Sequence, residues 1–156
     1  MMINTENKSL EKNQIAVLLA AITYSSNPTE EMQSLLPDWH IVWNGLETVD
    51  GNYAFIATDT SQTNYVLAIR GSLPPQGIFS DWYSFANWII EDLDVIKQTQ
   101  WPYASTEKPL IGQGTFTAFN NVLTMQDQFG SGKSIDDYLF DYAVTANKSL
   151  SIVGHS

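Results

Sequence analysis

A serine at the end of an apolar segment is the first residue of this sequence that could do chemistry. The run from Leu150 to Val153 leads into Gly154, His155 and Ser156. Gly-x-Ser after a strand is half of the nucleophile elbow, Gly-x-Ser-x-Gly, in which a sharp turn exposes a serine hydroxyl that attacks acyl carbons. The three residues alone are a common pattern, and an ordinary glycine-containing strand end explains them about as well.

A second strand end could supply the other part of acyl-transfer chemistry. The apolar run Tyr65 to Ile69 leads into Arg70, Gly71 and Ser72, and Ser72 lies 84 positions before Ser156 (156 − 72). An acyl-transfer serine needs backbone N–H groups that stabilise a developing negative oxygen, one of them in a loop after a second strand. The turn at Gly71 and Ser72 has the sequence of such a loop.

Two helices and three strands are predicted ahead of these motifs. Apolar residues at helical spacing predict a helix over residues 9 to 24. Asn27, as a helix cap, followed by Pro28 at the first helical position predicts a second helix that ends before Pro37. Runs rich in aromatic and β-branched residues then predict three strands joined by hairpin-like turns, at residues 39–43, 53–57 and 65–70. The third run is apolar on both faces, which predicts a central strand covered by helices on both sides.

Helix and strand alternate in the second half of the chain, which predicts an α/β fold. A helix is expected to open at Gly114 and to carry Phe116, Phe119 and Leu123 on one face. A second helical face follows and ends at Asn147; it comprises Ile135, Tyr138, Leu139, Tyr142 and Ala146. A short strand over residues 150–153 then leads into the terminal Gly-His-Ser.

Composition excludes several classes of function. The 17 acidic against 7 basic residues give a net charge of −10, and the scattered Lys and Arg argue against binding to nucleic acid or to anionic lipid. Cysteine is absent, and two histidines, His40 and His155, make a metal site improbable. No Sec signal peptide or transmembrane segment is recognisable, so the chain is expected to be cytoplasmic or exported by another route.

Four motifs in order resemble the class 3, fungal-type lipase family of the α/β-hydrolase superfamily. They are VLAIRGS (66–72), NWIIEDLD (87–94), GTFTAF (114–119) and LSIVGHS (150–156), and the resemblance covers about residues 53–156. It implies one incomplete domain over residues 1–156, the N-terminal portion of an α/β-hydrolase that is truncated at the nucleophile elbow. Such a domain has a mixed, mostly parallel sheet flanked by helices, here preceded by N-terminal helices over residues 1–37.

The resemblance also implies roles for individual residues. Ser156 matches the nucleophile within the elbow that Gly154 and His155 begin, with His155 packing behind the serine. Ser72 matches the oxyanion-hole residue, whose backbone N–H, helped by its hydroxyl, faces the negative oxygen. The other oxyanion N–H belongs to the residue after the serine, and the family's Asp and His lie beyond position 156. The chain alone is therefore expected to be an inactive fragment of an ester hydrolase, without cofactor or metal.

The substrate expected from the resemblance is a lipid acyl ester, met at a lipid–water interface. Residues 77–90, with Trp82, Phe85 and Trp88, would form a mobile lid over the acyl pocket, although an aromatic stripe at helical spacing is equally a core feature. An alternative function is a non-catalytic, lipase-like interaction module that uses an aromatic surface at residues 78–90. Lipase, phospholipase and esterase activities are not distinguished.

The sequence departs from the family pattern at two places. Fourteen residues separate Ser72 from Asn87, more than is usual, so Asp81-Trp82 competes with Asn87-Trp88 as the family's Trp motif; the residues that follow favour the second. Gln113 stands near the place of a histidine that family members usually have.

Four further polar groups have more than one interpretation. Asp92 and Asp94 could be paired carboxylates of a glycosidase, but a solvated acidic edge explains them better. Arg70 is expected to fix the loop before Ser72, with Asp partners nearby. His40 could serve as a distant base, but a strand-edge histidine between two tryptophans is the simpler interpretation.

Overall fold

A computed structural model describes residues 10–49, 51–71, 97–104, 106–107 and 109–154. In chain order its elements are α1 (Lys12–Ile22), α2 (Pro28–Leu35), β1 (Trp39–Asn44), β2 (Ala54–Asp59), β3 (Asn64–Ile69), β4 (Gln98–Gln100), β5 (Leu110–Gly112), α4 (Gln113–Leu123), α5 (Ile135–Leu139), η2 (Phe140–Val144) and β6 (Ser149–Gly154). None of the helices in this part of the chain is long and apolar enough to cross a membrane.

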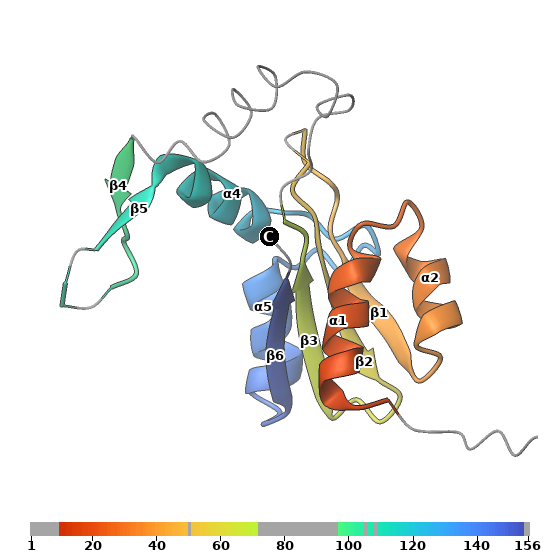
Figure 1. Cartoon of the computed structure of the whole chain (residues 1–156). Helices are drawn as coiled ribbons and strands as arrows, with labels where there is room; N and C mark the ends of the chain where they lie inside the picture. Colours follow the sequence, from red (N-terminus) through yellow and green to blue (C-terminus); the bar gives the residue numbers. More distant parts are fainter. Residues whose placement is uncertain (1–9, 50, 72–96, 105, 108, 155–156) are drawn as a thin grey trace, which may run out of the picture.

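The main sheet has the strand order β1-β2-β3-β6 (Figure 1). β1, β2 and β3 pair antiparallel, as the short turns between them require, whereas β6 pairs parallel with β3. A parallel partner needs a crossover connection, and the chain between β3 and β6 contains α4 and α5. The three predicted strands, the later strand and the mixed sheet flanked by helices are therefore confirmed.

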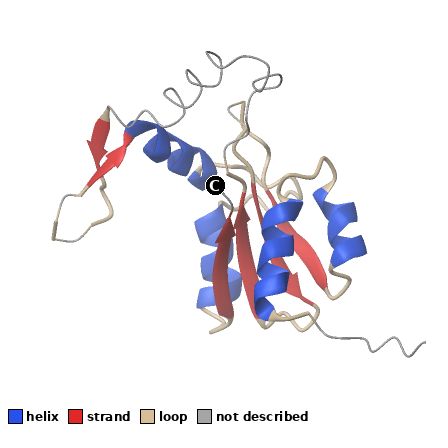
Figure 2. Cartoon of the chain, viewed as in Figure 1, coloured by secondary structure: helices blue, strands red, loops and turns tan. Residues whose placement is uncertain are grey.

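Each face of the sheet has its own hydrophobic core. Residues on opposite faces of β3 belong to different cores, because successive side chains in a strand point to opposite sides. Leu19, Met32, Phe55, Val66 and Ala68 are among the buried residues on the α1–α2 face. On the opposite face the buried residues include Trp43, Ile56, Leu67, Ile135, Leu139 and Ala143. Helices thus cover both faces of β3, as predicted (Figure 2).

The start of α2 differs in detail from the prediction. Asn27 occupies the residue before the helix and Pro28 its first position, but the Asn27 side chain does not cap a backbone N–H. Its Nδ2 instead donates to Glu30 Oε2 over 2.6 Å. This charge-assisted bond between two side chains is present at the start of α2, where a side-chain-to-backbone cap was expected.

The helix before β6 changes type within its length. α5 is an α-helix, but the five residues of η2 continue it as a π-helix. A π turn contains more residues than an α turn, so the buried face advances by one position. Ala143 is fully buried and Tyr142 is 46% exposed, which corrects the predicted face that included Tyr142 and Ala146.

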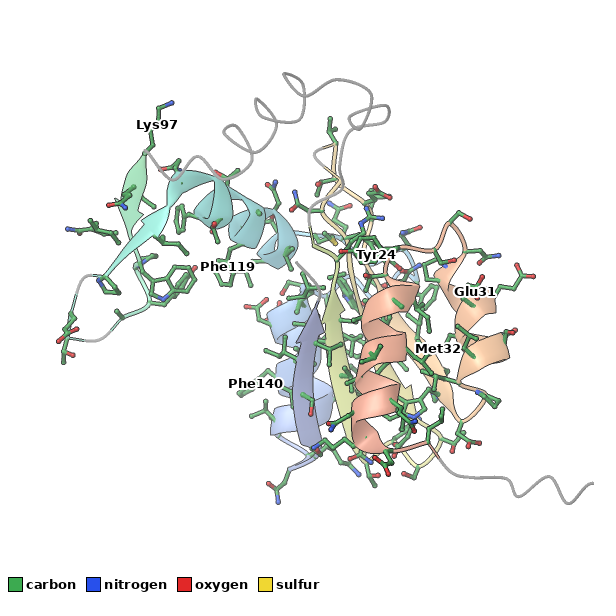
Figure 3. The ribbon with its side chains drawn as sticks, viewed as in Figure 1. Tyr24, Glu31, Met32, Lys97, Phe119 and Phe140 are labelled. Atoms are coloured by element: carbon green, nitrogen blue, oxygen red, sulfur yellow. The ribbon has the colours of Figure 1, made fainter. Side chains whose placement is uncertain are left out.

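A second, two-stranded sheet was not predicted from the sequence. β4 and β5 pair antiparallel over three residues each, and β5 leads directly into α4. Figure 1 shows this pair away from the main sheet. Rings of Trp101, Tyr103, Phe116 and Phe119 pack there with centroids 4.9 to 6.5 Å apart, and Phe119 is labelled in Figure 3.

The carboxylate of Asp127 is one of the groups that join the segment after α4 to the end of β1. Asp127 Oδ1 accepts hydrogen bonds from the backbone N–H of Asn44 at 2.9 Å and of Phe129 at 3.0 Å, and Oδ2 accepts from Ser131 N at 3.2 Å. Partial burial raises the pKa of this carboxyl, but the hydrogen bonds outweigh it and hold the pKa below its usual range. Asp127 is therefore a charged anchor at neutral pH.

Candidate active site

The ends of β3 and β6 lie side by side. The two strands run parallel with Ile69 opposite Gly154, so the Arg70-Gly71 turn and the residues after Gly154 follow neighbouring strand ends. A Cβ atom added to Gly154 would lie 3.2 Å from the carbonyl oxygen of Ile69. A glycine at this position therefore lets the two backbones approach closely.

Several predicted site residues lie outside the described residues. They are Ser72, Trp82, Phe85, Trp88, His155 and Ser156, together with the lid segment 77–90, both candidate Trp motifs and the carboxylates Asp92 and Asp94. Of the predicted elbow, the structure describes Gly154; of the predicted oxyanion turn, it describes Arg70 and Gly71. The geometry of the site is therefore derived from the two strand ends and from the contacts of Arg70 and Gly71.

Arg70 fills a structural role at the end of β3. Its side chain is 6% exposed and forms an ion pair of 2.5 Å between Nη2 and Glu47 Oε1. Nε and Nη2 also donate to the carbonyl oxygen of Gly51, at 3.1 and 2.7 Å. The guanidinium carbon lies 5.2 Å from the ring centroid of Tyr53, within the range of a cation–π contact. The expected role in fixing the loop is consistent with these contacts, but the acidic partner is a glutamate rather than an aspartate.

Tyr53 beneath the guanidinium stays protonated. Burial raises the pKa of its hydroxyl; the positive charge of Arg70 opposes this shift and the negative charge of Glu47 adds to it. The neutral hydroxyl donates to Asn44 Oδ1 over 2.5 Å. Tyr53 is thus a donor that connects Arg70 to the end of β1, and it supplies no base.

The backbone N–H groups of Arg70 and Gly71 are both hydrogen-bonded. Arg70 N donates to Tyr53 O at 2.9 Å, and Gly71 N donates to the hydroxyl of Tyr24 at 3.2 Å. Tyr24 was not identified from the sequence. It lies 47 positions before Gly71 and just beyond the end of α1, and no local pattern signals a contact over that separation.

A polar hollow of about 270 Å³ lies beside Arg70. Its lining residues are Ser25, Ser26, Asn27, Pro28, Thr29, Asn44, Glu47, Tyr53, Arg70 and Gln128. Hydroxyl, amide and charged groups dominate this lining, whereas an acyl chain needs apolar walls. The hollow is therefore unsuited to the acyl part of an ester.

His40 is remote from the strand end that carries Gly154. It lies on β1 opposite Thr58, and the same row of residues continues through Tyr65 to Leu150 on β6. β1 and β6 are three strand spacings apart, about 14 Å, and the row meets β6 four residues before Gly154. Within the described ranges, moreover, no group of three or more His, Asp or Glu residues is placed to hold a metal ion.

Comparison with known proteins gives matches at the level of the fold. No family model and no curated protein sequence matches this chain. A lipase from Rhizopus microsporus var. chinensis matches with a TM-score of 0.59 and 16% identity, over 94% of this chain and 47% of the lipase. A Yarrowia lipolytica lipase matches with a TM-score of 0.55 and 14% identity, over 90% of this chain and 48% of the lipase.

The triacylglyceride lipase of Rhizomucor miehei is a further match, with a TM-score of 0.50 and 18% identity, over 94% of this chain and 51% of the lipase. These matches confirm the predicted fold and the predicted resemblance of this chain to fungal lipases. The sequence spans about half the length of each of these lipases. The chain thus has the mixed α/β fold of fungal class 3 lipases, over about half of their length.

Proposed function

We propose that this chain is part of a serine hydrolase that cleaves lipid acyl esters. The observation that carries the proposal is the parallel pairing of β3 with β6, with Ile69 opposite Gly154. In sequence, Arg70-Gly71-Ser72 follows one strand and His155-Ser156 follows the other. Acyl transfer needs a nucleophile and an oxyanion donor from neighbouring strand ends, and this pairing supports that arrangement.

In the proposed reaction Ser156 Oγ attacks the ester carbonyl carbon while a histidine takes its proton, and an aspartate orients that histidine. The backbone N–H of Ser72 and that of the residue after Ser156 stabilise the negative oxygen of the tetrahedral intermediate. Collapse of this intermediate releases the alcohol, and water then hydrolyses the acyl-serine. The proposal places the histidine, the aspartate and the second N–H on polypeptide beyond position 156. Residues 77–90 are proposed as the lid of the acyl pocket.

Chemistry and fold both favour this proposal over a non-catalytic module. Three solved lipases share the fold, and four motifs of that family occur in order in the sequence. Arg70 and Gly71, which precede Ser72, are held by contacts with Glu47 and Tyr24, and a preorganised oxyanion hole requires such contacts. A binding module has no need of a fixed backbone donor at that turn.

The first test is to read the coding sequence beyond Ser156. An open frame that continues the elbow and supplies an aspartate and a histidine supports the hydrolase, whereas a stop codon supports the non-catalytic module. The protein from that frame should hydrolyse a short-chain p-nitrophenyl ester, and Ser156→Ala should abolish the turnover.

The 156-residue chain provides a second, independent test. Without acid and base it should show no turnover above its own Ser156→Ala variant, because loss of these groups costs several powers of ten in rate. Turnover by the short chain that depends on Ser156 would contradict the proposed location of the acid and the base.

A further inference from the structure

The turn after β3 is held from outside by the end of α1. Gly71 N donates to Tyr24 Oη at 3.2 Å, and Arg70 Nη1 reaches the carbonyl oxygen of Thr23 at 3.5 Å. Two consecutive residues of the turn therefore contact two consecutive residues beyond the helix. Figure 3 labels Tyr24 where α1 ends.

The residues at the end of α1 are buried or hydrogen-bonded to the helix. Thr23 is fully buried, and its hydroxyl donates to Ala20 O at 2.7 Å. Tyr24 N donates to Ala21 O at 3.0 Å. The backbone of Tyr24 is thus tied to a helix that packs on the sheet, and its hydroxyl accepts from Gly71 N.

A hydrogen bond to Gly71 restricts the turn at its most flexible type of residue. Glycine has more backbone freedom than any other residue, and Gly71 directly precedes Ser72. A hydrogen bond to Gly71 N fixes the peptide plane between Arg70 and Gly71. It thereby restricts the direction in which the chain enters Ser72.

We propose that Tyr24 is a positioning residue, which orients the oxyanion N–H of Ser72 by holding Gly71. This inference rests on the proposed function, in which that N–H stabilises the transition state. Oxyanion donors act only at the right place, and loss of one donor costs about 10²–10³-fold in kcat. A donor that is loosened rather than removed should cost less, about tenfold.

The test compares Tyr24→Phe with wild type in the protein that carries this sequence and completes the site. The variant keeps the ring and removes the hydroxyl that accepts from Gly71 N. With a soluble p-nitrophenyl ester, kcat should fall about tenfold while KM changes less than about twofold, since the donor acts mainly in the transition state. The control is Tyr142→Phe, which removes a hydroxyl from a 46% exposed tyrosine on η2 and should leave kcat unchanged.

Amide hydrogen exchange in the 156-residue chain tests the contact without catalysis. Exchange at Gly71 should accelerate in Tyr24→Phe and stay unchanged in Tyr142→Phe. Unchanged exchange at Gly71, an unchanged kcat, or a rise in KM alone would each overturn the role of Tyr24 while Ser156-dependent turnover persists. A wild-type protein without Ser156-dependent turnover would instead refute the hydrolase, and the role of Tyr24 with it.

Discussion

Replacement of Arg70 by methionine should destabilise the protein by about 3 kcal/mol. Methionine keeps most of the volume but removes the charge-assisted hydrogen bonds to Gly51 O. Both bonds end on one carbonyl oxygen, so they contribute about 1.5–3 kcal/mol together. The ion pair adds at most about 1 kcal/mol because the Glu47 side chain is 51% exposed. The contact with the Tyr53 ring adds about 0.5–1 kcal/mol.

The assay is urea unfolding followed by tryptophan fluorescence, together with thermal melting. For a chain of this length, 3 kcal/mol corresponds to a fall of roughly 6–12 °C in Tm. Glu47→Gln is the matched control, because it removes the ion pair and leaves the contacts of Arg70 with Gly51; it should cost about 1 kcal/mol or less. An equal loss in both variants would show that the ion pair, not the carbonyl contact, fixes this turn. A loss below about 1 kcal/mol for Arg70→Met would refute the structural role.

Two further substitutions test the contacts between β1 and the segment after α4. A Cβ atom added at Gly45 would lie 2.7 Å from Ala54 O and would also meet the Met125 side chain, so Gly45→Ala should lower the free energy of unfolding by about 1–3 kcal/mol in urea; a change near zero would contradict this packing. Hydrogen bonds lower the pKa of Asp127 in the folded state. Its contribution is therefore present above the unfolded-state pKa, near 3.8, and is lost as pH falls through the folded-state value. Asp127→Asn should accordingly reduce stability at neutral pH and flatten the loss of stability below about pH 4, and equal acid sensitivity of both proteins in urea titrations would oppose this assignment.

Local patterns in the sequence predicted the elements that carry their own signal. β1, β2 and β3 consist of aromatic and β-branched residues between turn-forming segments, and α4 has phenylalanines at helical spacing. β4 was missed because three residues, Gln98 to Gln100, are too few to show alternation. The π turn of η2 was missed because one additional residue per turn leaves no mark in composition.

Contacts between distant segments were not predictable from one sequence. The motifs identified Arg70 and its turn, but its partner Glu47 lies 23 positions away (70 − 47) on a loop before β2. Tyr24 is further still, and its relation to Gly71 exists only once α1 packs on the sheet. The motifs therefore predict a site, whereas the residues that hold the turn before Ser72 could be identified only from the fold.

Because a hydrophobic core lies on each face of the sheet, the register of the central strands needs a further determinant. Five consecutive residues of β2, Ala54 to Thr58, are buried. Alternation of apolar and polar residues therefore cannot specify which of these side chains point to each face of the sheet. The β2–β3 hairpin supplies that information. Asp59 accepts hydrogen bonds from the backbone N–H of Thr63 at 2.9 Å and of Asn64 at 3.2 Å, and from Asn64 Nδ2 at 2.6 Å. A carboxylate at the tip of one hairpin thus sets which side chains of β2 and β3 enter each core.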